Sequence, residues 1–382
     1  MITRIKSDRI IAGKSIVSGY VYLDGETIKE VSDKELPFDK EVDLTGYYVS
    51  PGFIDLHTHG GAGYDFIDGK ESIIKGCNFH LSHGTTSICP TFSAAPFPTM
   101  RRAVEGLAEA MQDPELKNNV LGAHMEGPYL SKAQCGAQST DHITPPVKED
   151  YESLVTSHGH AIARWSYAPE NDTDGNFCRY LRQHGIYPTA GHTNAIYDDM
   201  KVAMENGLNC VTHLYSCTST ITRKQGFRQL GVLETAMLHD ELYAEIIADG
   251  CHLPPELLRL IIKIKGVDRL AMVTDSLSVA GTDDKNGSSI AGASYIIEDG
   301  VCKLADRSAF AGSIATTDVL IRTVMQKAGV ALTDAVHMMT AVPAEMMNLN
   351  KGVLAAGKDA DIVAFDDDIN IKSVFVMGNQ VI

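Results

Sequence analysis

The sequence contains eight cysteines, but no two of them form a Cys-x-x-Cys pair. Structural zinc sites and disulfide frameworks are commonly built from closely spaced cysteines, so this scatter argues against both. We expect most of these thiols to behave as small buried hydrophobic groups.

Long apolar runs and an excess of positive charge are also missing. No stretch approaches the length of a membrane span, and the first residues lack the apolar segment of a secretory signal, which predicts a cytoplasmic protein outside the membrane. Lysine and arginine number 33 against 49 aspartates and glutamates, so the net charge is −16. This balance disfavours nucleic acid and anionic membranes as partners, although a local basic loop can still meet an anionic small molecule.

The composition is that of a soluble globular protein, with 44% hydrophobic and 21% charged residues. A length of 382 residues fits one large barrel with a small appended domain. Short β-rich pieces broken by glycines occupy both chain ends, which suggests that the ends meet in one β domain. We predict domain boundaries of 1–50 together with 350–382 for this domain and 51–349 for the remainder.

Between the ends, eight apolar strand-like runs alternate with helix-like stretches, the pattern of β/α units around a parallel sheet. Eight is the number of strands that closes a TIM-like (β/α)8 barrel. The runs cover residues 53–59, 85–89, 120–126, 163–168, 187–192, 209–213, 243–249 and 270–275. The sequence therefore predicts an α/β fold with a barrel at its centre.

The first of these runs ends in two histidines, His57 and His59. Side chains in a strand alternate, so both imidazoles point to the same side and can hold one metal ion. Taken alone, the pair fits equally well two polar residues where a strand leaves the core. Four later runs also end in metal-competent side chains, namely Glu126, His192, His213 and Asp275. Because such barrels place their chemistry at the C-terminal strand ends, we interpret this register as a metal centre.

The motifs at these positions resemble those of the N-acetylglucosamine-6-phosphate deacetylase family in the amidohydrolase superfamily. The order and spacing match from about residue 49 to the C-terminus. The motifs are Pro51-Gly52-Phe53-Ile54-Asp55, His57-Thr58-His59-Gly60, His124-Met125-Glu126-Gly127-Pro128, Ala190-Gly191-His192-Thr193, Thr212-His213-Leu214-Tyr215, Ala248-Asp249-Gly250-Cys251-His252, Thr274-Asp275-Ser276, Gly312-Ser313 and the segment from Gly352 to Asp361.

The resemblance implies a barrel plus a β-sandwich built from both chain ends. It also implies that Glu126, His192 and His213 bind one divalent metal and that His57 and His59 share Glu126 to hold a second. Many two-metal amidohydrolases instead bridge their ions with a lysine of the fourth strand. The fourth run here has no lysine, which disfavours dihydroorotase-like and urease-like activities and leaves the bridging role to Glu126.

A metal of this kind polarises a carbonyl and lowers the pKa of a bound water to roughly 7. Imidazoles and carboxylates suit zinc, iron or manganese, so the identity and the number of ions, one or two, stay open. Asp275 would be the general base that passes a proton from water to the leaving nitrogen. The alternative for Asp275 is a carboxylate that caps the following helix.

Four further segments carry candidate substrate contacts by the same resemblance. His252 would contact the sugar, although a surface histidine is the competing interpretation. Ala137 and Gln138 match the family's substrate loop, in which the position of Gln138 is often histidine. Ser216 and Cys217 stand where the family reads Asn-Ala, next to the phosphate. Arg223 and Lys224 lie in a basic loop that would reach the active site of a neighbouring subunit, which implies a homodimer, or would simply be solvated.

These observations predict a metal-dependent enzyme that removes acetate from the phosphorylated amino sugar N-acetylglucosamine 6-phosphate, a small-molecule substrate. Because Ser216 and Cys217 differ from the residues that the family has at these positions, the alternative is the same hydrolysis of N-acetylgalactosamine 6-phosphate or of another N-acyl amino sugar. From a different class, an inactive barrel kept as a structural subunit is disfavoured because all six candidate positions at the metal centre are filled.

Overall fold

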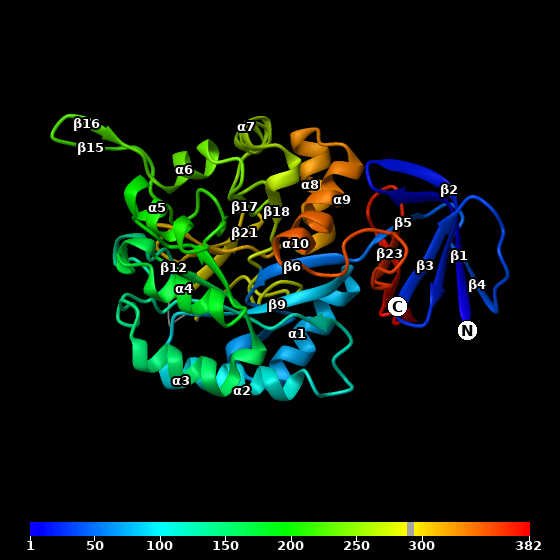
Figure 1. Ribbon diagram of the computed structural model, residues 1–382, viewed down its shortest axis with the longest axis horizontal. Coiled ribbons are helices and arrows are strands. Elements are labelled where there is room, and N and C mark those ends of the chain that lie inside the picture. Colours follow the sequence, from blue (N-terminus) through cyan, green and yellow to red (C-terminus); the bar gives the residue numbers. More distant parts are fainter. Residues whose placement is uncertain (289–293) are drawn as a thin grey trace.

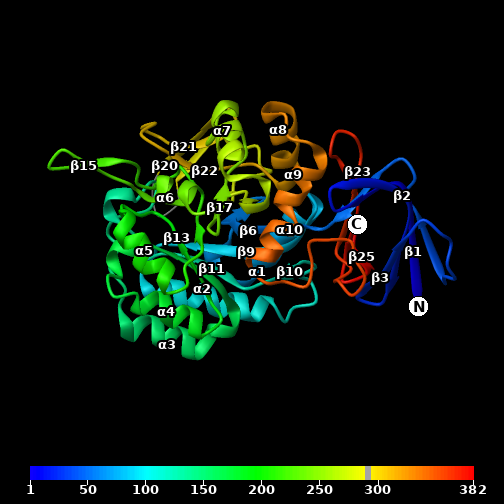
Figure 2. The same cartoon turned by 45° about the horizontal axis from the view of Figure 1, so that its top comes forward.

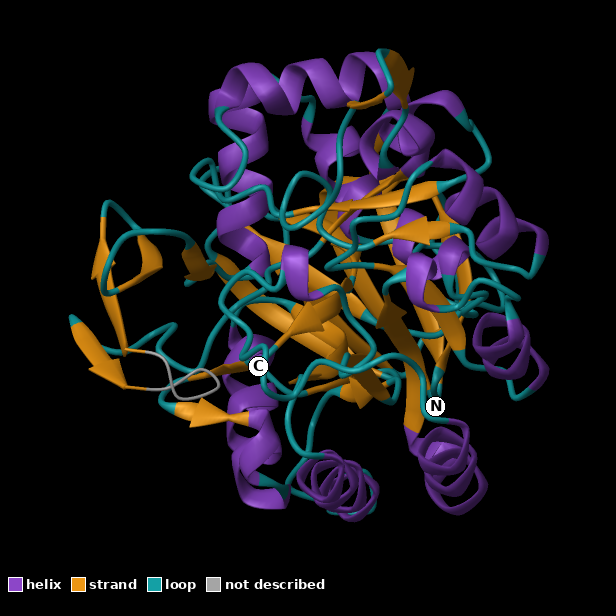
Figure 3. Ribbon diagram, turned by 90° about the vertical axis from the view of Figure 1, so that its left-hand side faces the viewer, coloured by secondary structure: helices purple, strands orange, loops and turns teal. Residues whose placement is uncertain are grey.

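A computed structural model describes residues 1–288 and 294–382. Its centre is a parallel barrel in which helices surround the strands (Figure 3). The eight barrel strands are β6 (Phe53–Thr58), β9 (Thr85–Ser93), β11 (Ala123–Glu126), β12 (Ile162–Tyr167), β13 (Tyr187–Ala190), β14 (Cys210–Val211), β17 (Tyr243–Ile246) and β18 (Leu270–Met272), with β10 (Asn119–Val120) beside β9. Each coincides with one of the eight runs expected from the sequence, so the barrel prediction is confirmed.

The barrel closes between its first and last strands at the same end as the candidate site. The backbone N–H of Asp275 donates to the carbonyl of His57 at 2.8 Å, and Thr58 and Ser276 form a parallel bridge. The segment after the last strand thus brings the carboxylate of Asp275 directly beside the first strand's histidines.

The helices pack their apolar faces against the outside of the barrel. In α2 the buried residues Met100, Val104 and Leu107 recur at the spacing of one helical face, as an amphipathic helix requires. The helices are α1 (Lys70–Ser82), α2 (Phe97–Ala110), α3 (Lys148–His158), α4 (Asn176–Gln183), α5 (Tyr197–Glu205), α6 (Val232–Leu238), α7 (Pro255–Lys265), α8 (Thr317–Ala328), α9 (Leu332–Met339) and α10 (Ala341–Met346), with 3-10 turns at Phe66–Asp68, Lys132–Gln134, Gly159–Ala161, Pro169–Asn171 and Val267–Arg269.

Both chain ends build one β domain at the side of the barrel, where the N- and C-termini lie together (Figures 1 and 2). Its strands are β1 (Ile2–Ala12), β2 (Ser15–Asp24), β3 (Thr27–Ser32), β4 (Lys40–Asp43), β5 (Tyr48–Pro51), β23 (Ile362–Phe365), β24 (Ile371–Val376) and β25 (Asn379–Gln380). The sheet curls around its own core, because Ile28 of β3 donates to the carbonyl of Lys358 at 2.7 Å, just before β23. The predicted union of the two ends is confirmed, and the boundaries 1–50, 350–382 and 51–349 stay a prediction.

Among the residues that the structure describes, three small sheets lie outside these two parts. The hairpin of β15 (Thr222–Lys224) and β16 (Phe227–Gln229) projects from the barrel on the side away from the β domain (Figure 1). A four-stranded sheet follows the last barrel strand, with β19 (Asn286–Ser288), β20 (Ser294–Glu298), β21 (Val301–Leu304) and β22 (Phe310–Gly312), and β7 (Gly60–Gly61) pairs with β8 (Tyr64–Asp65). Within the described ranges we find no helix with the length and apolar character needed to cross a membrane, and the predicted cytoplasmic location stays a prediction.

Candidate metal centre

The six side chains predicted for the metal centre converge at the C-terminal ends of five barrel strands. His57 lies in β6 and His59 just beyond it, and Glu126 ends β11. His192, His213 and Asp275 follow β13, β14 and β18 by two or three residues. All six are buried or nearly so, with Asp275 the most exposed at 13% of its side chain. The structure therefore brings together residues that are far apart in the sequence.

Glu126 is at the centre of this group. Its Oε1 lies 3.0 Å from Nε2 of both His192 and His213 and 3.4 Å from Nε2 of His57. Its Oε2 lies 3.4 Å from Nε2 of His59. One carboxylate thus contacts all four imidazoles, two from each half of the predicted site.

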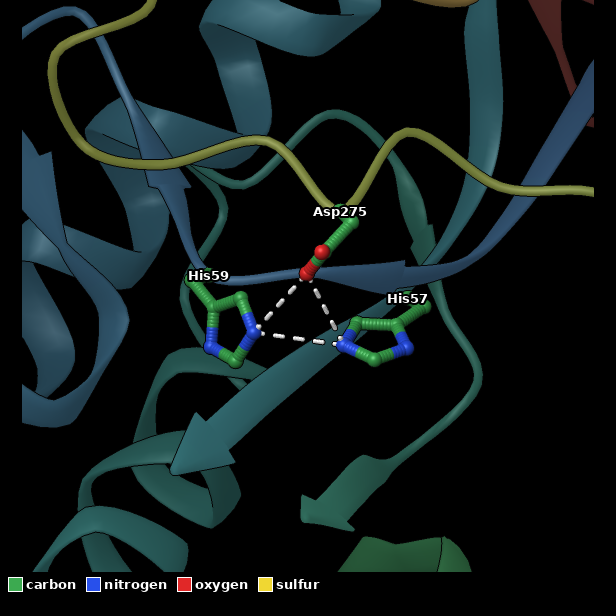
Figure 4. Close-up of side chains that lie close together, drawn as sticks. All are labelled: His57, His59 and Asp275. Carbon is green, nitrogen blue, oxygen red and sulfur yellow. Dashed lines mark hydrogen bonds and ion pairs between the residues drawn. The ribbon is translucent and has the colours of Figure 1, made fainter. Parts of the chain in front are cut away.

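Asp275 completes the half of the site that contains the first two histidines (Figure 4). Its Oδ1 lies 3.2 Å from Nε2 of both His57 and His59, and these two nitrogens are themselves 3.2 Å apart. Figure 4 shows the three groups pointing toward one another, the histidines from β6 and its end and the aspartate from the segment after β18.

The backbone is strained where three of these side chains leave their strands. His192, His213 and Asp275 have φ values of 46°, 27° and 49°, in the left-handed region that residues other than glycine rarely occupy. Such strain persists only where the surrounding structure enforces it, and it is concentrated at functional sites. The strain turns side chains inward that a regular strand would direct elsewhere.

Hydrogen bonds on the outer side of the rings fix which nitrogen faces the site. Nδ1 of His192 lies 2.9 Å from the carbonyl of Gln134, which can only accept, so Nδ1 carries a proton and, in the neutral ring, Nε2 presents the lone pair. Nδ1 of His59 is paired at 3.1 Å with Ser93 Oγ. Within the described residues, Nδ1 of His57 and of His213 is buried without a partner.

The carboxylates are held in their ionised form. Burial alone would raise the pKa of Glu126, but the charges of His57 and His192 hold it well below its usual range. Burial would likewise raise the pKa of Asp275, and the imidazoles of His57 and His59 keep it far below normal. Burial lowers the pKa of His57, whereas His59, despite the same effect, is raised to about 9 by Asp275 and Glu126.

This arrangement fits a divalent cation. Two clusters each place one ligand atom per residue within 4.8 Å of the others, His57 with His59 and Asp275, and His57 with Glu126 and His213. His192 approaches the same Oε1 as His213. Imidazole nitrogens face carboxylate oxygens at 3.0–3.4 Å, which requires a positive charge between them, and a metal ion bound by the same atoms can supply that charge in place of protons.

No role is predicted from the sequence for three buried side chains beneath the site, namely His124, Arg164 and Glu245. His124 lies with its ring centroid 4.5 Å from that of His57 and is held between Thr91 and Ser166, at 3.1 Å and 2.6 Å. In the barrel interior Arg164 and Glu245 form an ion pair with both side chains fully buried. Arg164 is on the fourth strand, where a bridging lysine is absent.

A pocket of about 250 Å³ opens onto the metal centre. Ala137, Gln138, Ser216, Cys217 and His252 line this pocket, and their roles stay a prediction. Sequence reasoning missed one wall, formed by the segment that enters β22. The lining residues are His59, Ser93, Glu126, Gly136, Ala137, Gln138, His192, His213, Tyr215, Ser216, Cys217, His252, Asp275, Leu277 and Ala309 to Gly312.

Arg223 and Lys224 are not part of this pocket within one chain. Both are exposed in β15, in the projecting hairpin (Figure 1). Arg223 lies directly opposite Arg228 of β16. Because like charges at opposed positions are unfavourable, this pair is suited to an anion that lies outside the chain.

His252 is fixed by Asp249. Nδ1 of His252 donates to Asp249 Oδ2 at 2.7 Å, and the backbone N–H groups of Cys251 and His252 donate to Oδ1 at 2.8 Å. Burial lowers the pKa of His252, but the Asp249 carboxylate outweighs this effect and raises it. The ring also packs edge-on against Phe310, with centroids 4.9 Å apart, so His252 joins the two walls of the pocket.

Residues 48–381 match the model of the Amidohydrolase family. The chain belongs to the amidohydrolase family. Among the most similar relatives is an N-acetylglucosamine-6-phosphate deacetylase of Bacillus subtilis, 30% identical over 98% of this chain and 96% of the relative. An N-acetylgalactosamine-6-phosphate deacetylase of Escherichia coli O157:H7 is 27% identical over 86% of each chain.

Solved structures of amidohydrolases agree with this membership. A mutant N-acetyl-D-glucosamine-6-phosphate deacetylase of Mycobacterium smegmatis, in complex with N-acetyl-D-glucosamine-6-phosphate, superposes with a TM-score of 0.91. It is 26% identical and the match covers 100% of this chain and 99% of that one. The resemblance seen in the sequence motifs is therefore confirmed, together with the barrel and the β domain.

Proposed function

We propose that this amidohydrolase is a divalent-metal-dependent enzyme that hydrolyses N-acetylglucosamine 6-phosphate to glucosamine 6-phosphate and acetate. The observation that carries the proposal is the convergence of four imidazoles and two carboxylates from five strand ends, of which all but the fully buried His57 line one pocket. The substrate follows from the names of the relatives and from the complex of the Mycobacterium smegmatis protein.

Two groups of residues would hold the metal. Glu126 Oε1 with His192 and His213 forms one position, and the second consists of His57, His59 and Asp275 with Glu126 Oε2. The sequence favours zinc, iron or manganese, because imidazole with carboxylate suits all three. We propose one or two ions per subunit.

The chemistry divides between the cation and the chain's own side chains. A divalent ion held here would polarise the acetamide carbonyl and make water a better nucleophile. Asp275 is ionised and lies on the pocket wall, so it can accept a proton from the attacking water. Protonated in this way, it can deliver the same proton to the sugar nitrogen as the C–N bond breaks. General acid–base catalysis of this kind contributes roughly 10²–10⁴-fold to the rate.

The sugar would lie against His252 and the neighbouring Phe310, which both line the pocket. The protonated Nδ1 of His252 is used by Asp249, which leaves Nε2 for the substrate. Tyr215 and Phe310 keep 37% and 39% of their surfaces exposed beside the pocket and can cover the apolar face of a sugar ring. Ala137 and Gln138 line the opposite side, nearer to Glu126.

The phosphate would lie at the segment that contains Ser216 and Cys217. Left-handed conformations at Tyr215 and Cys217, with φ of 77° and 52°, bend this segment in the way that turns backbone N–H groups toward an anion. Ser216 adds a hydroxyl donor. Such contacts depend on the backbone and therefore do not require the asparagine that the family normally has here.

We further propose that the basic hairpin completes the phosphate site of a second copy in a homodimer. The hairpin carries Arg223, Lys224 and Arg228 and extends away from its own barrel (Figure 2). Its turn presents Phe227, which is 78% exposed, and Ile221 and Leu238 nearby are 50% and 60% exposed. Apolar side chains of this size on a projecting arm are typical of surfaces covered by a partner subunit.

A second substrate is supported by one relative and one segment. The Escherichia coli protein of similar length is named for N-acetylgalactosamine 6-phosphate, and Ser216 and Cys217 change the chemistry near the phosphate and the sugar. N-acetylgalactosamine 6-phosphate is therefore the alternative, followed by other N-acyl amino sugars.

The proposal is tested by measuring acetate release from purified protein reconstituted with zinc, iron(II) or manganese. The panel contains N-acetylglucosamine and N-acetylgalactosamine, each with and without a 6-phosphate. We expect the highest kcat/KM for N-acetylglucosamine 6-phosphate and a large loss without phosphate. A higher kcat/KM for N-acetylgalactosamine 6-phosphate would make that sugar the substrate instead. No acetate release with any metal would contradict the proposal as a whole.

A further inference from the structure

The amide of Gln138 is built into the metal centre. Its Oε1 accepts a hydrogen bond from the backbone N–H of Ala94 at 2.7 Å, and its Nε2 donates to Glu126 Oε2 at 2.8 Å. The residue is only 7% exposed. A third neighbour, His192 Nε2, lies at 3.5 Å and is at the limit of a hydrogen bond.

The neighbours determine which way this amide faces. The backbone N–H of Ala94 can only donate, and the Glu126 carboxylate can only accept. A flipped amide would set two donors against each other on one side and two acceptors on the other. The N–H groups must therefore face Glu126, and the bond from Ala94 polarises the amide and strengthens its donation.

This donation makes the two oxygens of Glu126 different. Oε1 faces Nε2 of His192 and His213 at 3.0 Å, and apart from the more distant His57 it contacts only these rings. Oε2 faces His59 at 3.4 Å and also receives the N–H of Gln138. The oxygen that belongs with His57, His59 and Asp275 therefore has part of its negative charge and one lone pair already engaged.

We propose that Gln138 makes the two cation positions unequal. The position formed by Glu126 Oε1, His192 and His213 binds its ion first and tightly, and Gln138 weakens the position formed by His57, His59, Asp275 and Glu126 Oε2. Gln138 is thus a positioning residue that sets the occupancy of the second ion. This inference rests on the metal dependence proposed above.

The test is a calorimetric titration of metal-free protein with Zn²⁺, combined with metal analysis of the protein after dialysis. For the unchanged protein we expect a tight first event and a weaker second event. Gln138→Met keeps the side-chain length but removes the donor. A hydrogen bond to a charged group is worth enough to change an affinity by about ten-fold or more, so the second ion should bind at least about ten-fold more tightly in this variant. The first event should not change.

A matched control should weaken the binding of the second ion, whereas Gln138→Met should tighten it. Ser93 contacts Nδ1 of His59 at 3.1 Å, so Ser93→Ala removes support for a ligand of the second ion. Loss of such a contact weakens metal binding by about 10- to 100-fold. A general loosening of the site would weaken the second ion in both variants, whereas the proposal requires the two variants to move in opposite directions.

A second variant, Gln138→Glu, keeps the test possible if Gln138→Met does not fold. Gln138→Glu keeps the size of the side chain and the acceptor for Ala94, and it adds a negative charge next to Oε2, so it too should tighten the second event. An unchanged or weaker second event in whichever of these variants is folded, with the first event intact, overturns the role of Gln138. If the unchanged protein binds no Zn²⁺ at all, the proposed metal dependence fails instead.

Discussion

Two buried clusters of charge lie at opposite ends of the barrel strands and differ in how completely they are paired. Near the N-terminal strand ends, Lys351 Nζ lies 2.6 Å from Asp361 Oδ2 and 3.1 Å from Ser87 Oγ. Asn119 also donates to Asp361 Oδ2 at 2.8 Å, and the Met377 N–H donates to Oδ1 at 2.9 Å. Every charge in this cluster, which joins the barrel to the β domain, has a partner within the chain.

The cluster at the C-terminal strand ends is incomplete by the same measure. Glu126 and Asp275 are carboxylates without lysine or arginine partners among the residues that contact them, and the groups that approach them are imidazole nitrogens, which can equally bind a cation. The backbone is strained at His192, His213 and Asp275. The comparison teaches that a buried network satisfied by its own chain stabilises the fold, whereas one that needs an external cation marks the site of chemistry.

The largest effect that would sharpen this contrast comes from Asp275→Asn. Asparagine keeps the shape but cannot accept a proton from water, so we expect kcat to fall by roughly 10²–10⁴-fold. Metal bound through Glu126, His192 and His213 should remain, and the unfolding temperature should change little. Steady-state kinetics with metal analysis measure both. Activity close to that of the unchanged protein would remove Asp275 from the proposed role.

Asp361→Asn should produce the opposite pattern. It removes the nearer and more deeply buried carboxylate of Lys351 and leaves only Asp359 Oδ2, at 3.3 Å, so we expect a loss that approaches the cost of breaking a buried ion pair, about 3–5 kcal/mol of unfolding free energy. Urea unfolding measures this loss, and kcat/KM of the folded protein should stay unchanged. The double variant with Lys351→Met and Asp361→Leu, which replaces both charges by apolar groups, should regain much of the stability. If Asp361→Asn lowered the activity without lowering the stability, the cluster around Lys351 would serve catalysis, and the contrast between the two clusters would be wrong.

Chelation gives a smaller effect that should be confined to the metal centre. A ligand present at a hundred times its Kd stabilises the folded state by about 2.7 kcal/mol, so EDTA should lower the unfolding free energy by an amount of that order. In the Asp361→Asn variant, EDTA should lower the unfolding free energy by the same amount, in addition to the loss caused by the substitution itself. Glu126→Gln, which removes the central ligand, should be indifferent to EDTA. Equal sensitivity in all three proteins would mean that the cation binds elsewhere.

The sequence was sufficient to locate the incomplete cluster because the proposed metal ligands stand at the ends of apolar runs. His59, Glu126 and Asp275 end or follow strands β6, β11 and β18, and the C-terminal ends of barrel strands meet in space. The exact strand ends were harder to predict. β9 continues through Pro90 to Ser93, where its pairing with β6 shifts register, and β14 ends at Val211 because His213 leaves the extended conformation.

The orienting partners could not be predicted, because they depend on contacts between distant segments. Gln138 was recognised as a substrate-loop residue, but its bond to Glu126 joins two loops whose approach no local pattern encodes. The tautomer of His192 is fixed by the backbone carbonyl of Gln134, and any residue at position 134 would offer the same carbonyl, so the residue type gives no indication of this contact. The wall at Phe310 is brought to the site by a small sheet inserted after the last barrel strand.

The smallest expected effect concerns the pair formed by Asp249 and His252, which connects the metal centre to the substrate pocket. Burial lowers the pKa of His252, but Asp249 raises it by more than burial lowers it, so the net pKa is above the ordinary 6.5. The imidazolium is therefore favoured by folding. Its contribution to stability is fully present below the unfolded pKa of 6.5 and is lost as the pH rises through the higher folded pKa.

Asp249→Asn should lower the pKa of His252, because the carboxylate that favours its charge is removed while burial remains. A neighbouring opposite charge typically accounts for a shift of about one unit or more. The alkaline limb of kcat/KM should move to lower pH by that amount if the charged ring helps to hold the substrate, whereas kcat at saturation should change less. NMR titration of the His252 ring protons measures the pKa directly. A lowered pKa with an unmoved kcat/KM profile would show that His252 supports the pocket wall at Phe310 without using its charge on the substrate.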